Sequence, residues 1–222
     1  MSEISQSISQ IISEAGVMTA WEAIAVLLAI VYLVLAMRTN IWCWAAAFIS
    51  TAIYTVLFWK VSLLMESVLN VYYMAMALYG YWMWMQQPDN GEAHHIDDKG
   101  SPIISWPVST HFLLISITLL VSLVVGYLMA NYTQASFPYL DSATTCFAVM
   151  TTYLVAKKVL ENWFYWMVIN PVSIYLYFSK GLMLTTALFV VYVFMAIAGY
   201  FMWRKMWVMD LQSDAQLAHQ HG

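Results

Sequence analysis

Residues 80–84 read Gly-Tyr-Trp-Met-Trp, and residues 199–203 read Gly-Tyr-Phe-Met-Trp. The two stretches differ only where one aromatic residue replaces another, and their spacing of 119 residues indicates that the chain is duplicated. Three further pairs share a spacing of 121 residues: Tyr32-Leu33-Val34 with Tyr153-Leu154-Val155, Trp42 with Trp163, and Ile53-Tyr54 with Ile174-Tyr175. The change of spacing predicts that the two halves differ in length by two residues between Tyr54 and Gly80.

The composition places the chain in a membrane. Apolar residues make up 63% of it and charged residues 9%, whereas soluble domains have about 45–50% and about 25%. So few charges could not cover the surface of a soluble protein, which excludes a cytosolic enzyme and a disordered chain. The net charge of −4 gives no support for binding nucleic acid. We therefore predict an all-α polytopic membrane protein in contact with the lipid bilayer.

Seven stretches are long and apolar enough to cross a bilayer as helices, which requires roughly 20 residues each. They are Ala20–Met37, Ile41–Trp59, Ser62–Met85, Val108–Ala130, Asp141–Ala156, Asn162–Phe178 and Leu182–Val208. No short apolar run follows a basic region at the N-terminus, so we expect no removable signal peptide.

The duplication and the seven helices together predict two parallel three-helix repeats joined by a linker helix, because an odd helix between them restores the chain direction. The predicted segments are a polar or amphipathic tail over 1–19, repeat A over 20–85, a polar cytoplasmic linker over 86–107, the linker helix over 108–130, repeat B over 139–208 and a C-terminal tail over 209–222. Such a pattern places a substrate site between the repeats, near the bilayer midplane.

The basic residues predict the orientation of the chain. Lys60 and Lys180 fall on the side of the N-terminus. The opposite side carries Arg38, Lys99, Lys157, Lys158, Arg204 and Lys205. Because basic residues favour the cytoplasmic side, we expect the N-terminus outside and the C-terminus in the cytoplasm. The outer helix ends then form an acidic mouth, with Glu22, Glu66 and Asp141.

The centres of the predicted spans carry no charged residue and no histidine. This argues against a proton relay and a haem site, and the last span has no central lysine for a retinal Schiff base. The apolar spans also lack a nucleophile with a matching base, so we expect neither an enzyme nor a cofactor or metal. Cys43 and Cys146 lie in apolar stretches and are interpreted as small core residues.

The span 162–178 carries the strongest candidates for binding. Trp163, Trp166 and Asn170 lie on one helix face, and Pro171 frees a backbone carbonyl beside them. Asn70, from the other repeat, is also central and could converge with Asn170. The alternative is structural, since tryptophans collect at membrane interfaces and amides tie helices together.

Such residues suit a particular class of solute. Aromatic faces attract cations, and amides match a carboxamide or hydroxyl groups. Phosphates require Arg or Lys, which the predicted pore lacks. The sequence therefore favours an uncharged or cationic heterocycle without phosphate.

The chain resembles the PnuC family of bacterial nicotinamide riboside transporters over residues 20–207. The resemblance is carried by Trp21-Glu22-Ala23, Tyr79-Gly80-Tyr81-Trp82, Asp141-Ser142, and the block Glu161-Asn162-Trp163 with Trp166 and Asn170. It implies a fold like that of the SWEET sugar transporters, in the bacterial inner membrane. It also implies facilitated diffusion of nicotinamide riboside, trapping by a cytoplasmic kinase, and a supply for NAD synthesis. Assembly as a homo-oligomer, such as a trimer, is in keeping with the family.

The resemblance also implies roles for individual residues. Trp163 and Trp166 would flank the pyridinium ring, and Asn170 and Asn70 would bond the carboxamide or ribose. At the position of Asn70 we would expect glutamine, so this contact has a shorter reach.

Further contacts and three other functions stay open. Tyr73 and Tyr177 are candidates for hydroxyl contacts, and Glu66 is a mouth charge or a ligand. The alternatives are a transporter of thiamine or another heterocyclic vitamin, a non-transporting receptor or scaffold, and a proton-coupled permease that uses Glu66 or Asp141.

Overall fold

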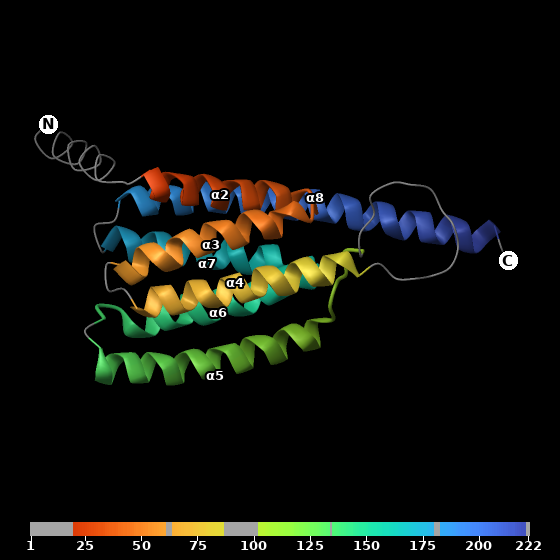
Figure 1. Cartoon of the computed structure of the whole chain (residues 1–222). Coiled ribbons are helices and arrows are strands. Elements are labelled where there is room, and N and C mark those ends of the chain that lie inside the picture. Colours follow the sequence, from red (N-terminus) through yellow and green to blue (C-terminus); the bar gives the residue numbers. More distant parts are fainter. Residues whose placement is uncertain (1–19, 61–63, 87–101, 134, 180–182, 221–222) are drawn as a thin grey trace, which may run out of the picture.

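The computed structural model describes residues 20–60, 64–86, 102–133, 135–179 and 183–220, and its secondary structure there is helical apart from one isolated bridge between Ile104 and Val159. The helices are α2 (Ala20–Met37), α3 (Trp42–Lys60), α4 (Leu64–Met85), α5 (Val108–Tyr132), α6 (Pro138–Ala156), α7 (Asn162–Ser179) and α8 (Met183–Gln220) (Figure 1). The all-helical class is thus confirmed. The predicted tail over 1–19 and most of the linker over 86–107 lie outside the described residues.

The six repeat helices form a closed ring. Helices α2, α3 and α4 pack in sequence, as do α6, α7 and α8, and the ring closes where α4 contacts α6 and α2 contacts α8. Even-numbered helices run one way and odd-numbered helices the other (Figure 1). The two repeats are therefore parallel, as predicted. Helix α5 lies outside the ring and packs along α6.

One spacing, 119 residues, relates the two repeats throughout their first two helices. The turn after α2 contains Thr39 with φ 53°, and the turn after α6 contains Lys158 with φ 52°. In each turn the backbone N–H of the third residue after the helix donates a hydrogen bond of 3.0 Å back into the helix: Asn40 N to Leu35 O, and Val159 N to Leu154 O. The predicted spacing of 121 residues is therefore wrong, and so is the two-residue difference in length.

The error arose from neighbouring tryptophans. Trp44, and not Trp42, is the partner of Trp163, because Trp44 packs on Gly80 as Trp163 packs on Gly199. Trp42 is 64% exposed and faces outward. Short aromatic matches recur by chance in a chain this rich in aromatic residues. Aligning Trp42 instead of Trp44 with Trp163 changed the apparent spacing from 119 to 121 residues.

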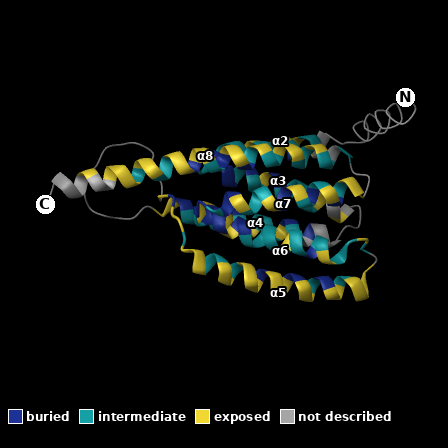
Figure 2. Cartoon of the chain, turned by 180° about the vertical axis from the view of Figure 1, so that it is seen from behind, coloured by how far each residue is buried: buried dark blue, intermediate teal, exposed yellow. Residues whose placement is uncertain are grey.

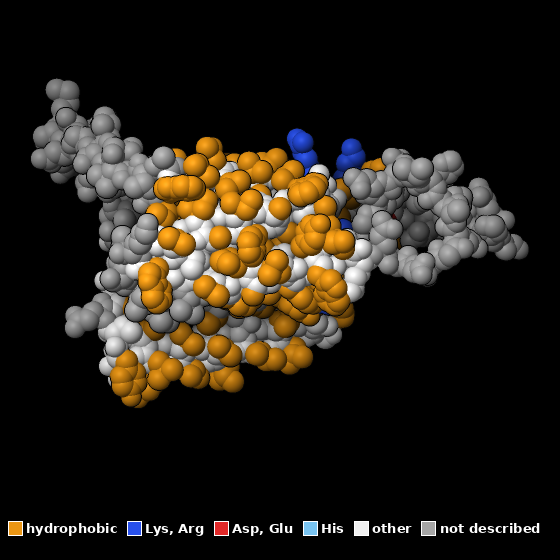
Figure 3. All heavy atoms as spheres, viewed as in Figure 1, with side chains coloured by type: hydrophobic (Ala, Val, Ile, Leu, Met, Phe, Trp, Pro, Cys, Tyr) orange, Lys and Arg blue, Asp and Glu red, His pale blue; other side chains and the backbone are white. Residues whose placement is uncertain are grey.

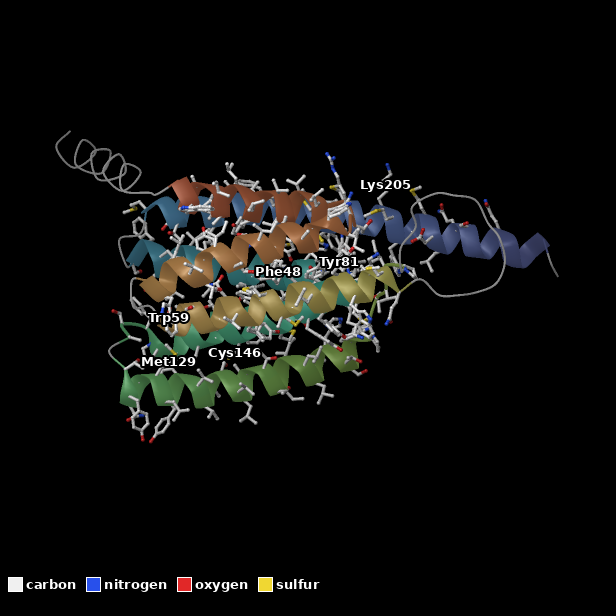
Figure 4. The ribbon with its side chains drawn as sticks, in the orientation of Figure 1. Phe48, Trp59, Tyr81, Met129, Cys146 and Lys205 are labelled. Carbon is white, nitrogen blue, oxygen red and sulfur yellow. The ribbon has the colours of Figure 1, made fainter. Side chains whose placement is uncertain are left out.

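Large apolar side chains cover the outside of the bundle. By length and composition, two of the described helices qualify strictly as membrane spans, over Val108–Tyr132 and Thr185–Ser213, and shorter apolar helices cover Ala23–Met37 and Trp42–Leu57. Figure 3 shows apolar side chains over the visible flank, with Lys and Arg only near the end where α8 leaves the bundle. Lys205 lies at that end, and Trp59 at the opposite one (Figure 4).

Candidate functional site

Four tryptophans close one end of the ring. We call Trp44, Trp84, Trp163 and Trp203 the tryptophan plug. Trp44 meets Trp84 at 5.4 Å and 85°, and Trp163 meets Trp203 at 5.4 Å and 89°, so the two repeats contribute matching edge-to-face pairs. The plug belongs to the buried core at the end where α8 leaves the bundle (Figure 2).

The plug joins the repeats by exchanged hydrogen bonds. Trp84 on α4 donates from Nε1 to the carbonyl oxygen of Ala156 at 3.1 Å, and Trp203 on α8 donates to the carbonyl oxygen of Ala36 at 3.0 Å. Each bond runs from the third helix of one repeat to the end of the first helix of the other. This reciprocity gives the ring an approximate two-fold axis.

Three buried polar atoms in this region have no hydrogen-bond partner among the described residues: Trp44 Nε1, Trp163 Nε1 and Asn162 Oδ1. Leaving such a group unsatisfied costs about 1–3 kcal/mol. The packing of the plug therefore carries an energetic cost.

Lys158 places a positive charge within the plug. Its side chain is 3% exposed, and Nζ lies 4.5 Å from the centroid of the Trp84 ring, a distance suited to a cation–π interaction. Burial lowers the pKa of Lys158 to about 8. Its neighbour Lys157 lies 5.8 Å from the rings of Tyr79 and Tyr153, and a hydrogen bond with Tyr79 raises the pKa of Lys157.

The predicted face of α7 is buried, but its members differ in role. Trp163 is 2% exposed and is held by Gly199 and Trp203, so it is above all a packing residue of the plug. Trp166 is partly buried against the same core. Asn170 is 3% exposed. Pro171 does not break the helix, which continues to Ser179.

The remaining predicted residues lie on both repeats. Asn70 on α4 is buried. Tyr73 packs on Tyr72 at 5.6 Å, and Tyr177 packs on Phe189 at 5.0 Å. No direct contact joins α4 to α7 in the described chain, so Asn70 and Asn170 lie on separate walls of the ring. The side chain of Glu66 lies outside the described residues.

Sequence reasoning found Tyr73 but missed the tyrosines near it. Tyr32 on α2 interacts electrostatically with Tyr73 on α4 and Tyr192 on α8, and Tyr192 interacts with Tyr54 on α3. Tyrosines of both repeats are therefore within electrostatic range of one another. The correct spacing of 119 residues could have found one of them, because it pairs Tyr73 with Tyr192.

A cavity lies elsewhere, between α5, α6 and α7. Among the described residues, its lining contains none of the predicted binding residues, although it includes other residues of α7, namely Phe164, Val168 and Ile169. Its volume is about 540 Å³. Since it is outside the ring, it is a separate feature from the candidate substrate site.

An apolar exterior, a ring of six helices from two parallel repeats, and amides and hydroxyls buried within it define a multi-pass membrane protein of the transporter class. The chain belongs to the nicotinamide mononucleotide transporter family, whose pattern matches residues 19–205. The predicted relationship is thus confirmed.

Two curated relatives are transporters rather than enzymes. The nicotinamide riboside transporter PnuC of Escherichia coli (strain K12) is 22% identical over 174 residues, which is 70% of this chain and 72% of that protein. The riboflavin/roseoflavin transporter RibM of Streptomyces davaonensis is 22% identical over 178 residues, or 80% of this chain and 81% of that protein.

A solved structure has the same fold. The crystal structure of the vitamin B3 transporter PnuC superposes with a TM-score of 0.68 at 21% sequence identity, over 85% of this chain and 82% of that chain. The arrangement of seven helices is therefore that of a known transporter.

Proposed function

We propose that this protein carries nicotinamide riboside across the bacterial inner membrane by facilitated diffusion. A cytoplasmic kinase would then phosphorylate the riboside, which traps it and supplies NAD synthesis. The observation that carries the proposal is the pair of buried amides, Asn70 and Asn170, on opposite repeats of the ring. The resemblance to a nicotinamide riboside transporter supports the same choice of substrate.

Each candidate residue has a role in this proposal. Trp166 would face the pyridinium ring, since aromatic faces attract cations. Asn170 and Asn70 would bond the carboxamide or ribose. Tyr73 would add a hydroxyl contact, and Tyr177 is a second candidate on α7, where its ring packs on Phe189 of α8. Trp163 would act as a wall rather than a ring partner, because its six-membered ring is already packed on Gly199.

The distribution of cations favours a riboside over its phosphorylated form. The described basic side chains lie just after α2, in the α6–α7 connector and on α8 just after Trp203, all next to the plug or beyond it: Arg38, Lys157, Lys158, Arg204 and Lys205. A phosphate inside the ring would thus lack the Arg or Lys partner that it requires.

The same basic residues support an orientation. We infer that the plug end faces the cytoplasm, with the C-terminus, because positive charge collects there. The plug would then close the inner end of the passage in the conformation described.

Counterflow in proteoliposomes tests the transport proposal. Vesicles preloaded with unlabelled riboside should take up labelled riboside without an ion gradient. Asn170→Ala should lower the exchange at least tenfold, whereas Asn131→Ala should not, since Asn131 is an exposed residue of α5 whose amide bonds only its own helix. Exchange that requires a pH gradient would contradict a uniporter and favour the proton-coupled alternative.

A second vitamin is the rival substrate. The similarity to a riboflavin/roseoflavin transporter supports it. Excess thiamine or riboflavin should leave the exchange of labelled nicotinamide riboside unchanged. Competition by either vitamin at equal concentration would reassign the substrate, and absence of exchange with every vitamin would favour a receptor or scaffold.

A further inference from the structure

An apolar cavity of about 540 Å³ lies outside the ring, between the linker helix α5 and repeat B. Its walls include Ile115 of α5, Phe147 of α6, and Val168 and Val172 of α7. Val168 is 66% exposed, on the apolar outer surface of the bundle. The cavity is thus open to the hydrocarbon region rather than to water.

The packing of α5 against α6 and α7 explains why the cavity exists. At the end away from the plug, α5 lies close against α6. Gly126 leaves no room for a side chain, since a Cβ there would lie 2.6 Å from Cδ1 of Tyr139. Ser142 on α6 also donates a hydrogen bond of 2.8 Å to the carbonyl oxygen of Ser122 on α5. At the plug end α5 makes no direct helix contact with α7 in the described chain. Only side chains span the space between α5 and α7 there, and they leave the cavity between them.

The cavity has the depth of one lipid leaflet. Its lining on α7 runs from Glu161, just before the helix, to Val172. Eleven residues at 1.5 Å each give about 16 Å. That is half of a hydrocarbon core of about 30 Å. An acyl chain entering at the plug end would therefore reach the midplane.

A polar cluster closes the plug end of the cavity. Glu161 accepts hydrogen bonds from Ser105 Oγ and from the backbone N–H of Trp106, and His111 Nδ1 lies 2.9 Å from the hydroxyl of Tyr165. The other ring nitrogen, His111 Nε2, is buried and has no hydrogen-bond partner within the part of the chain that the structure describes. It lies 3.6 Å from Glu161 Oε2, beyond hydrogen-bond distance.

This arrangement matches the two parts of a phospholipid. His111 lines the cavity. When Tyr165 donates to Nδ1, the imidazole hydrogen is on Nε2, and Nε2 makes no hydrogen bond among the described residues, its ion-pair partner Glu161 being 3.6 Å away. We propose that the cavity binds one acyl chain of a phospholipid from the leaflet at the plug end, and that an ester oxygen of this lipid accepts a hydrogen bond from His111 Nε2. The proposal needs no assumption about the transported substrate.

Photolabelling tests this site. The protein is reconstituted with a phosphatidylethanolamine whose acyl chain carries a diazirine, irradiated, and digested for peptide mapping. We expect at least fivefold more label on the cavity segments of α5, α6 and α7 than on the lipid-facing side of α3. Equal labelling of all helices would overturn the proposal.

Two variants sharpen the result. Val168→Trp fills the cavity and should lower the labelling of Phe147 and its neighbours at least fivefold, whereas Val56→Trp, on the exposed face of α3, should not. His111→Phe keeps the ring but removes the donor, and should lower labelling at least threefold by the phospholipid probe while a diazirine alkane labels as before. Unchanged phospholipid labelling in both cavity variants, or crosslinks between two protein chains in place of lipid adducts, would contradict lipid occupancy.

Discussion

The indole nitrogen of Trp84 donates a hydrogen bond of 3.1 Å to the carbonyl oxygen of Ala156, across the boundary between the two repeats. Trp203 makes the corresponding bond to Ala36. The two bonds hold the same end of the ring shut from opposite sides. Each bond therefore links the third helix of one repeat to the end of the first helix of the other.

Removing either bond should loosen the plug. Trp84→Phe and Trp203→Phe keep an aromatic ring but leave a carbonyl without its donor, which costs about 1–3 kcal/mol. Each variant should lower the unfolding temperature in detergent and make Cys43, which is fully buried in the same core as the plug, more reactive toward maleimide. We expect at least a fivefold faster modification of Cys43, measured in a Cys146→Ala background.

Trp42→Phe is the matched control, because Trp42 lies on α3 but faces outward. It should leave the labelling rate and the unfolding temperature unchanged. Equal Cys43 reactivity in all three variants would show that the two bonds do not hold the plug closed.

The packing of Trp163 on Gly199 should be intolerant of a single methyl group. An added Cβ at Gly199 would overlap the six-membered ring of Trp163, and such overpacking costs about 1–3 kcal/mol. Gly199→Ala should therefore destabilise the protein, and Trp163→Phe should relieve part of the loss. A double-mutant cycle of thermal unfolding measures this coupling. Strictly additive effects of the two substitutions would mean that the indole of Trp163 does not press on α8 at Gly199.

The buried charge of Lys158 should make stability depend on pH. Its pKa is about 8 in the fold and 10.5 when unperturbed, so between these values the unfolded chain binds more protons. Stability should then rise as the pH increases from about 8 to about 10.5, by roughly 2–3 kcal/mol, because the cost of burying the charge disappears. Unfolding in detergent at a series of pH values measures the rise.

Lys158→Met should abolish this rise and be more stable than the parent near pH 7. Lys157→Met should keep it, since the pKa of Lys157 is raised and this residue does not titrate in the window. A rise that persists in Lys158→Met would assign the pH dependence to another group.

Lengthening the amide on α4 tests the proposed substrate contact. Asn70→Gln should bind nicotinamide riboside at least as tightly as the parent, because the longer side chain reaches further into the ring. Asn70→Ala should bind at least tenfold more weakly. Titration calorimetry gives both dissociation constants, with the folded fraction checked by gel filtration. Equal affinity of all three proteins would remove Asn70 from the site.

Much of the fold could be predicted because hydropathy and duplication are properties of whole segments. The repeated stretches beginning at Gly80 and Gly199 located the third helix of each repeat correctly. The end of α8 could not be located in this way, since hydropathy falls after Val208 whereas the helix continues to Gln220. Loss of apolar character marks the edge of a bilayer and not the end of a helix.

The candidate site was harder to predict than the fold, because its residues serve two purposes. Trp163 carries a spacing typical of binding, yet its ring is held by Gly199 from another helix, and only the fold reveals that contact. Tyr32 and Tyr192 were missed because their convergence depends on how the ring closes.

Helix α8 runs through 38 residues from Met183 to Gln220, which corresponds to about 57 Å at 1.5 Å per residue. Its last part stands clear of the bundle as a straight rod (Figure 1). A helical protein fused in register to this rod would share its axis and serve as a rigid fiducial for single-particle cryo-microscopy. The 25.4 kDa chain is otherwise too small and too deeply enclosed by detergent to be aligned easily.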